Sequence, residues 1–359
     1  MAFAKISGFR KGLISMVLVV GFLVAATMLS FTIFGNSSAK DGEVNLYIFS
    51  DTHIRSKGDD TNGRKEVNNS VKEYIKGDLD PNGTNLVCIL GDLMDNNQHS
   101  EDSEYLKIWG HKACKDEKFT VCDLYGNHDI VSMLDVKHFT FSKRYKNIIK
   151  EQAAWRKEAL ANYGYKSMDV KQDLRPFRPD NHYKQALYRW YHVINGVKFH
   201  FIVLNLGYMI DDDDPKYSET KEFFKQALKE IGDEPMFILQ HYGFNANDVS
   251  GHSSEWWPQK EQEEFIKLIE NRNVMALLNG HVHSFLKGAD SRVINGTQYK
   301  LPFSHTVALT GSSWSIMKLK LSPKEGYNNK ATIKYEKVSK NSGNGSITVT
   351  PIKTAEWPA

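Results

Sequence analysis

The central feature of the sequence is the stretch LVCILGDLMDNNQH at residues 86–99. Residues 86–90 are apolar and rich in strand-forming side chains, so they have the length and composition of a fully buried β-strand. Gly91 ends this run, and the carboxylates of Asp92 and Asp95 follow. Open α/β sheets form their ligand crevices at the carboxyl ends of such strands. Because a carboxylate buried there needs a cation or hydrogen-bond donors, the stretch predicts a ligand site.

Four other apolar runs of the chain end in the same way, at residues 44–50, 119–124, 236–239 and 274–278. Each is strand-like and is followed by Asp, Asn or His. One such residue after a strand is usually a turn former or a cap, but five ends of this kind favour a shared site. Oxygen and imidazole ligands without thiolates suit divalent metals such as Mn, Fe, Zn or Mg.

In order along the chain, these strand ends resemble the signature of the calcineurin-like metallophosphoesterase superfamily. The blocks are Asp51-x-His53, Gly91-Asp92-x-x-Asp95, Gly126-Asn127-His128-Asp129, His241 and Gly280-His281-x-His283. A single block such as GNHD is weakly specific, whereas the ordered set is highly specific. The resemblance implies an α/β fold, namely a four-layer α/β/β/α sandwich of two mixed β-sheets with a dimetal site at strand ends.

The resemblance also implies a role for each residue. One metal would be held by Asp51, His53, Asp92 and His283. The other would be held by Asp92, Asn127, His241 and His281, so that Asp92 bridges the two. His128 would lie outside the metals and close to the leaving group of the substrate, with Asp129 orienting it. A histidine that only supports the ligands by hydrogen bonds is the alternative for His128.

Two metals about 3.5–4 Å apart can clamp a phosphate and turn a bridging water into hydroxide near neutral pH. His128 can donate a proton or a hydrogen bond to the departing oxygen. We therefore expect a metal-dependent phosphoesterase that hydrolyses a phosphomonoester or a phosphodiester by a dimetal-bound hydroxide. A non-catalytic metal-binding scaffold and a membrane interaction protein on the same fold are the alternatives.

Several positions separate the chain from known branches of the superfamily. Purple acid phosphatases carry a tyrosine ligand where this chain has Asp95, which argues against a purple ferric site. Protein serine/threonine phosphatases carry an arginine where this chain has Asn96, and their LRGNHE block here reads LYGNHD. These differences favour the small-molecule and phosphodiesterase side of the superfamily.

Residues 1–40 are expected to contain a membrane anchor. Lys5, Arg10 and Lys11 precede residues 13–35, which are uncharged and long enough to span a bilayer as a helix. The placement of charge predicts a single-pass protein with a cytosolic N-terminus and an extracytoplasmic catalytic domain. A cleaved signal peptide, followed by secretion, is the alternative; the long apolar stretch without a clean A-x-A site favours the anchor.

The remaining chain is expected to form a catalytic domain over residues 41–338, with an insertion at 130–188, followed by a C-terminal strand and a frayed tail at 339–359. Helical spacing of apolar residues predicts helices at residues 64–75, 104–112, 218–231 and 259–271. The formal net charge is +3 and diffuse, so it indicates no nucleic-acid partner, whereas a phosphate ester is the expected substrate.

The cysteines and the N-x-S/T sequons raise two questions, whether a disulfide forms and whether the chain is glycosylated. Cys88 belongs to the buried strand, while Cys114 and Cys122 would form either a disulfide in an oxidising compartment or two free thiols. Sequons begin at Asn36, Asn68, Asn82, Asn295 and Asn344. They would be glycosylated only in a lumenal domain of an organism that glycosylates.

Overall fold

The computed structural model describes residues 43–358, apart from 57, 59, 61–62, 96–98, 115–116, 130–133, 136–139, 142–166, 170–186, 208–217, 245–258 and 310–312. The chain divides into Met1–Lys40 and Asp41–Ala359, and the described residues all belong to the second unit. The anchor expected at residues 13–35 lies outside the described residues and stays a prediction. Across the described part of the chain, no helix is long and apolar enough to cross a membrane.

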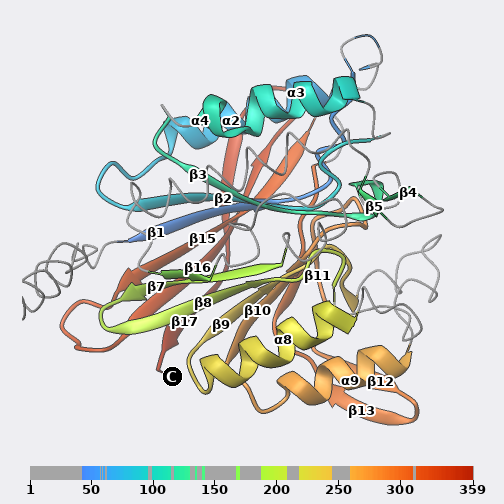
Figure 1. The fold of residues 1–359 in the computed structure, drawn as a ribbon. Coiled ribbons are helices and arrows are strands. Elements are labelled where there is room, and N and C mark those ends of the chain that lie inside the picture. Colours follow the sequence, from blue (N-terminus) through green and yellow to red (C-terminus); the bar gives the residue numbers. More distant parts are fainter. Residues whose placement is uncertain are drawn as a thin grey trace, which may run out of the picture. The chain divides into compact units, whose positions relative to one another are not determined.

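Two large mixed β-sheets form the centre of the second unit (Figure 1). In order across the six-stranded sheet, the strands are β17 (Ile347–Trp357), β16 (Ala331–Lys340), β15 (Trp314–Pro323), β1 (Val44–Phe49), β2 (Thr84–Leu90) and β3 (Thr120–Leu124). The seven-stranded sheet has β11 (Leu286–Lys287), β14 (Ser304–Thr306), β10 (Val274–Asn279), β9 (Met236–Leu239), β8 (Val197–Val203), β7 (Tyr188–Ile194) and β6 (Ser167–Asp169). The prediction of a mixed α/β protein with two mixed sheets is confirmed.

Short hairpins accompany these sheets. One pairs β12 (Ser291–Ile294) with β13 (Thr297–Lys300), and the other pairs β4 (Leu134–Asp135) with β5 (Thr140–Phe141). Of the insertion expected at residues 130–188, the structure describes β4, β5, β6, Leu187 and the start of β7; the rest lies outside the described residues.

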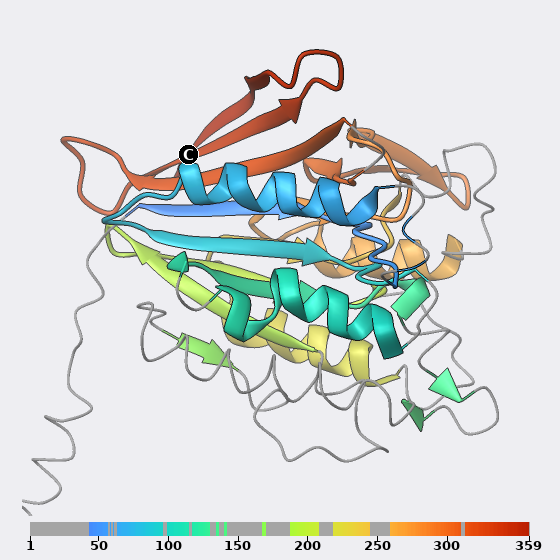
Figure 2. The same cartoon turned by 90° about the horizontal axis from the view of Figure 1, so that it is seen from above.

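Helices lie on the outer face of each sheet (Figures 1 and 2). The six-stranded sheet carries α2 (Arg64–Gly77), α3 (His99–Trp109) and α4 (His111–Cys114), and the seven-stranded sheet carries α8 (Ser218–Ile231) and α9 (Gln259–Ile269). Helix α2 forms where it is predicted because Val67, Val71 and Ile75 recur on one face, and all three are buried. The helix predicted at 104–112 is found as α3 and α4, and the other two predicted helices are confirmed.

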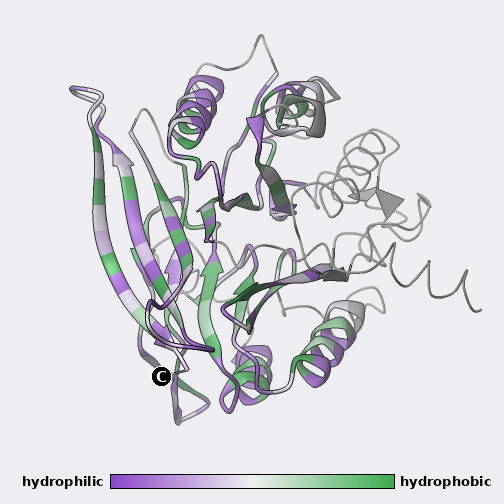
Figure 3. Cartoon of the chain, turned by 90° about the vertical axis from the view of Figure 1, so that its left-hand side faces the viewer, coloured by the Kyte–Doolittle hydropathy of each residue, from purple (hydrophilic) through white to green (hydrophobic). Residues whose placement is uncertain are grey.

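The strand residues alternate between two hydrophobic cores. Leu46 and Ile48 of β1 lie in the core between the sheets, whereas Tyr47 and Phe49 lie in the core with the helices. Figure 3 shows this pattern as apolar colour on the strands and on the inward faces of the helices. The parallel strands β1, β2 and β3 are buried on both faces, which is why they are mostly apolar in the sequence instead of alternating between apolar and polar residues.

The expectation of a frayed C-terminal tail is wrong. Strand β17 pairs antiparallel with β16 from Ala331 opposite Trp357 to Lys340 opposite Ile347. Pro351 interrupts the alternation of this segment, but β17 is the edge strand of its sheet, where a proline is tolerated.

All three cysteines are free thiols, which excludes the disulfide between Cys114 and Cys122. Cys122 lies opposite Cys88 in the core between the sheets, whereas Cys114 lies in the core beneath the helices. The sequon at Asn68 is inaccessible to glycosylation in the folded protein. Its side chain is fully buried and donates hydrogen bonds to the carbonyls of Thr52 and Arg64.

Candidate metal centre

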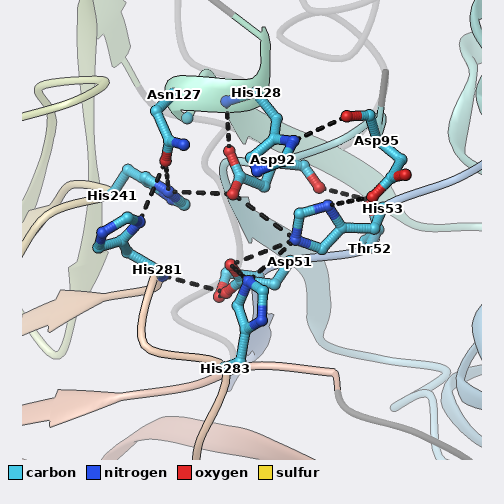
Figure 4. A network of polar contacts seen from close by, with 12 residues as sticks. Asp51, Thr52, His53, Asp92, Asp95, Asn127, His128, His241, His281 and His283 are labelled. Atoms are coloured by element: carbon cyan, nitrogen blue, oxygen red, sulfur yellow. Dashed lines mark hydrogen bonds and ion pairs between the residues drawn. The ribbon is translucent and has the colours of Figure 1, made fainter. Parts of the chain in front are cut away.

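The residues expected to bind metal lie together at the carboxyl ends of five strands (Figure 4). Strand β1 leads to Asp51 and His53, β2 to Asp92, β3 to Asn127, β9 to His241, and β10 to His281 and His283. Neighbouring parallel strands end at the same edge of a sheet, so β1, β2 and β3 bring three loops together. The parallel pair β9 and β10 does the same in the other sheet. The site thus draws side chains from both sheets.

The first group of donor atoms contains Asp51, His53, Asp92 and His283. The Nε2 atom of His283 lies 3.2 Å from Oδ1 of Asp51 and 3.0 Å from Nε2 of His53. The Nε2 atom of His53 is 3.8 Å from Oδ1 of Asp51 and 3.6 Å from Oδ2 of Asp92. His283 is half exposed while the other three are buried, so the group opens to solvent on the side of His283.

The second group contains Asp92, His241 and His281, together with the side-chain oxygen of Asn127. The Oδ1 atom of Asn127 lies 3.0 Å from Nε2 of His241 and 3.1 Å from Nδ1 of His281. His241 also directs Nδ1 at the carbonyl of Leu90, at 2.8 Å. Because a carbonyl only accepts, Nδ1 carries a hydrogen, and Nε2 is the atom that can bind a metal.

Asp92 belongs to both groups. Its Oδ2 atom lies 3.6 Å from Nε2 of His53 and 3.4 Å from Nε2 of His241. Its Oδ1 atom accepts a hydrogen bond of 2.9 Å from the backbone N–H of His128, which fixes the orientation of the carboxylate. One oxygen of Asp92 therefore faces both sets of ligands.

These donors fit a pair of divalent ions. Metal bonds of about 2.1 Å place neighbouring ligand atoms roughly 3–3.5 Å apart. Most distances between donor atoms within the two groups are close to that range, from 3.0 Å between the rings of His53 and His283 to 3.4 Å between Asp92 and His241. In addition, Oδ1 of Asp51 and Oδ2 of Asp92 are buried and receive no hydrogen bond among the described residues. A buried carboxylate oxygen without a donor is costly, and a cation at this position would compensate for it.

The backbone at the site is unusual as well. Positive φ angles occur at Asp51 (56°), His53 (40°), Asp92 (51°), His281 (73°) and His283 (49°). Such conformations are uncommon for residues other than glycine and cluster at functional sites, at a cost of about 1–3 kcal/mol each. The surrounding fold therefore holds these residues in a backbone conformation that they would not adopt on their own.

Glycines allow the loops to approach one another closely. A Cβ atom on Gly126 would lie 2.2 Å from Oδ1 of Asp92, and one on Gly91 would lie 2.6 Å from Nδ1 of His241. A Cβ atom on Gly280 would lie 2.4 Å from Oγ of Ser50. The glycines of the GD and GNHD blocks thus leave the space that His241 and Asp92 occupy, and the glycine of the GHxH block leaves space for Ser50 next to Asp51.

His128 and Asp129 occupy different environments. Nδ1 of His128 lies 2.7 Å from the carbonyl oxygen of Asp95, which leaves Nε2 as the ring atom that can exchange a proton with a substrate. The buried carboxylate of Asp129 instead accepts hydrogen bonds from the N–H groups of Leu93, Met94 and Gly126. In place of the expected contact with the His128 ring, Asp129 fixes the loops that carry Asp92 and Asn127.

Sequence reasoning assigned no role to Asp95, which has several. Its Oδ1 atom is 3.1 Å from Nδ1 of His53, and its Oδ2 atom is 2.7 Å from Nη2 of Arg55. Its carbonyl contacts His128. Asp95 therefore orients a candidate metal ligand and the candidate proton donor. The GDxxD block pointed to this residue, but nothing in the sequence showed which neighbour it faces.

Strong electrostatic coupling shifts the pKa values at the site. Burial disfavours the charged forms, but the nearby rings of His283 and His53 hold the pKa of Asp51 well below its usual range. Against the same effect of burial, the carboxylates of Asp51 and Asp95 raise the pKa of His53 to about 10, and Asp92 raises that of His241 to about 9. Without metal, protons on the histidines balance the carboxylates.

Metal binding is therefore expected to release protons. At pH 7 both His53 and His241 are protonated in the metal-free protein, since their pKa values lie above 7. A metal requires the unprotonated nitrogen, so we expect release of about two protons per chain at pH 7 and affinity that rises with pH from 7 to about 10, the pKa of His53. Calorimetric titration with Mn²⁺ in buffers of different ionisation enthalpy measures this number. An enthalpy that is independent of the buffer would contradict the prediction.

The comparisons with known proteins agree with this geometry. The family model described as calcineurin-like phosphoesterase matches residues 44–285, which is more than half of the chain. This chain belongs to the calcineurin-like phosphoesterase family. The matched segment of this phosphoesterase contains every candidate metal ligand named above. No curated protein matches the chain.

Solved structures resemble this calcineurin-like phosphoesterase only distantly. "GAP50 the anchor in the inner membrane complex of Plasmodium" is 13% identical with a TM-score of 0.49, and the match covers 87% of this chain and 90% of that one. A second structure, described as "Putative 5'-Nucleotidase from Staphylococcus aureus", is 14% identical with a TM-score of 0.41, and the match covers 86% of this chain and 54% of that one. A Mycoplasma pneumoniae phosphatase is 12% identical with a TM-score of 0.31, covering 88% and 92%.

Proposed function

We propose that this chain is a hydrolase that cleaves a phosphomonoester or a phosphodiester with the help of two divalent metal ions. The observation that carries the proposal is the position of Asp92, whose Oδ2 atom faces both donor groups and receives no hydrogen bond from the residues that the structure describes. A carboxylate shared in this way is suited to holding two like-charged ions close together. The family to which the chain belongs supports the same reaction class.

The candidate ligands form two groups, one for each ion. Asp51, His53 and His283 would hold one ion and Asn127, His241 and His281 the other, with Asp92 between them. Ions bound there would polarise the phosphate and lower the pKa of a water molecule that attacks it. Because His283 is half exposed, the substrate phosphate would enter from its side.

His128 would act on the leaving group. The hydrogen on Nδ1 is held by the carbonyl of Asp95, and the ring lies against that of His53 with centroids 4.7 Å apart. These contacts fix the ring next to the first donor group, with Nε2 as its exchangeable position. From there His128 would donate a proton to the departing oxygen.

The proposal is tested with metal-free protein that is reloaded singly with Mn, Zn, Fe, Mg or Ni. Hydrolysis of matched nitrophenyl monoesters and diesters is then compared with the Asp92→Asn variant as the blank. Turnover above the blank supports a metallohydrolase, and the ratio of the two rates indicates the class of natural ester. Two bound ions without turnover of any ester would instead favour a non-catalytic metal-binding scaffold.

The role of His128 leads to a separate prediction. We expect His128→Ala to retain both metals and to slow hydrolysis of an alkyl phosphate ester by about 100- to 10,000-fold, the usual range for loss of a general acid. The loss should be smaller for a nitrophenyl ester, whose leaving group needs less protonation. Equal losses for both esters, or loss of bound metal, would show that His128 supports the ligands instead.

A further inference from the structure

Asn205 is a buried residue outside the predicted ligand set, and it joins the loops of the two sheets. It follows β8 in the seven-stranded sheet and is fully buried. Its Oδ1 atom accepts a hydrogen bond of 3.2 Å from the backbone N–H of Tyr125, at the end of β3 in the six-stranded sheet. Its backbone carbonyl accepts a hydrogen bond of 2.6 Å from the N–H of His241.

These contacts connect two of the loops that supply the second donor group. Tyr125 is two residues before Asn127, and Oδ1 of Asn127 lies 3.0 Å from Nε2 of His241. Asn205 therefore holds the loop that carries Asn127 with its side chain, and the loop that carries His241 with its backbone. Because the two loops come from different sheets, Asn205 fixes the distance between a ligand from one sheet and a ligand from the other.

We infer that Asn205 is a positioning residue for the ion held by Asn127, His241 and His281, an inference that rests on the metal binding, though not on the hydrolysis, of the proposed function. The alternative is that asparagine is present only because the backbone here has a φ of 53°, which asparagine tolerates. Stability does not favour this side chain, since its Nδ2 atom is buried without a hydrogen-bond acceptor among the described residues. The acceptor Oδ1 is the part of the side chain with a structural partner.

Two substitutions separate these explanations. Asn205→Gly keeps the backbone conformation and removes the acceptor, whereas Asn205→Asp keeps an acceptor for the Tyr125 N–H. Asn195→Gly is the matched control, because Asn195 has a φ of 49° and lies in the turn between β7 and β8, where its side chain donates to the carbonyls of Tyr327 and Lys330. Asn195→Gly therefore replaces an asparagine of similar backbone conformation by glycine at a position away from the donor groups.

Binding of Mn²⁺ to the full chain is measured by equilibrium dialysis and elemental analysis, with thermal unfolding recorded for each variant. In N205G we expect one ion to bind as in the wild type and the other about 10- to 100-fold more weakly, as is usual when a partner that orients a ligand is lost. N205D should bind both ions much more tightly than N205G binds its weaker ion, because it keeps the acceptor for the Tyr125 N–H. N195G should bind both ions normally.

Normal binding of both ions by N205G would overturn the inference, and so would equal weakening in N205D and N205G. If N205G is unfolded, N205S, whose side chain is too short to reach Tyr125, takes its place in the comparison with N205D. The readout is independent of turnover. A wild-type chain that binds two ions and hydrolyses no ester would overturn the proposed function and leave this inference standing, whereas a wild-type chain that binds no ion would overturn both.

Discussion

Replacing Asp92 by asparagine is expected to lower phosphate-ester hydrolysis by about 100- to 10,000-fold, because several kcal/mol of charge stabilisation are lost at about 1.36 kcal/mol per factor of ten. The new side chain has nearly the same shape and still accepts the hydrogen bond from the N–H of His128 through Oδ1. It loses the negative charge and places an NH₂ group where Oδ2 faces His53 and His241. Bound metal should fall from two ions per chain to one or none.

Asp78→Asn is the control for this change. Asp78 lies at the C-terminal end of α2, where its carboxylate accepts hydrogen bonds from the hydroxyls of Tyr47 and Tyr74. The control removes a carboxylate charge without touching the donor groups, so metal content and turnover should be those of the wild type. Asp92→Asn with two tightly bound ions and undiminished turnover would refute the bridging role.

The second large effect is expected from Gly126→Ala. A methyl group there would lie 2.2 Å from Oδ1 and 2.5 Å from the backbone nitrogen of Asp92, and 2.8 Å from Cε1 of His241. Neither neighbour can move away without moving a metal ligand. A displacement of about 1 Å at a reacting centre costs about 100-fold in rate, so we expect turnover to fall by at least that factor.

Gly77→Ala is the matched substitution. Gly77 is the last residue of α2, and a Cβ atom at this position meets nothing within 4 Å. Comparing kcat, metal content and thermal unfolding for the two alanine variants separates crowding of the site from a general effect of adding a methyl group. Equal, small effects in both would show that the loops around Gly126 are more adaptable than the structure indicates.

Much of the site could be predicted from the sequence because its signal is local. Strands such as β2, buried on both faces, appear as short apolar runs, and the ligands follow them immediately. Which strands pair was not visible in the same way, and the two-sheet arrangement came from the resemblance to a family. The sequence predicts the C-terminal strand but not its extent, because the exposed residues of β17 that follow Pro351 resemble a frayed tail, although pairing with β16 orders them as far as Trp357.

Residues that act through distant partners could not be assigned from the sequence. Asp129 bonds to the N–H groups of Leu93 and Met94, so its partners lie in another block of the chain. The role of Asp95 depends on the ring orientations of His53 and His128, which only the tertiary structure defines. Asn205 follows a strand as the ligands do, but its side chain bonds to a backbone N–H across the site.

The left-handed backbone at Asp51, His53, Asp92, His281 and His283 limits how this centre can be engineered or diversified. A replacement at any of these positions changes two things at once, the donor atom and the ease with which the chain adopts the local turn. Asparagine tolerates this conformation, whereas valine, isoleucine and threonine do not. Alanine scanning would therefore overstate the contribution of each ligand. A library restricted to asparagine, aspartate, histidine and glycine would sample the accessible chemistry of the centre without unfolding its loops.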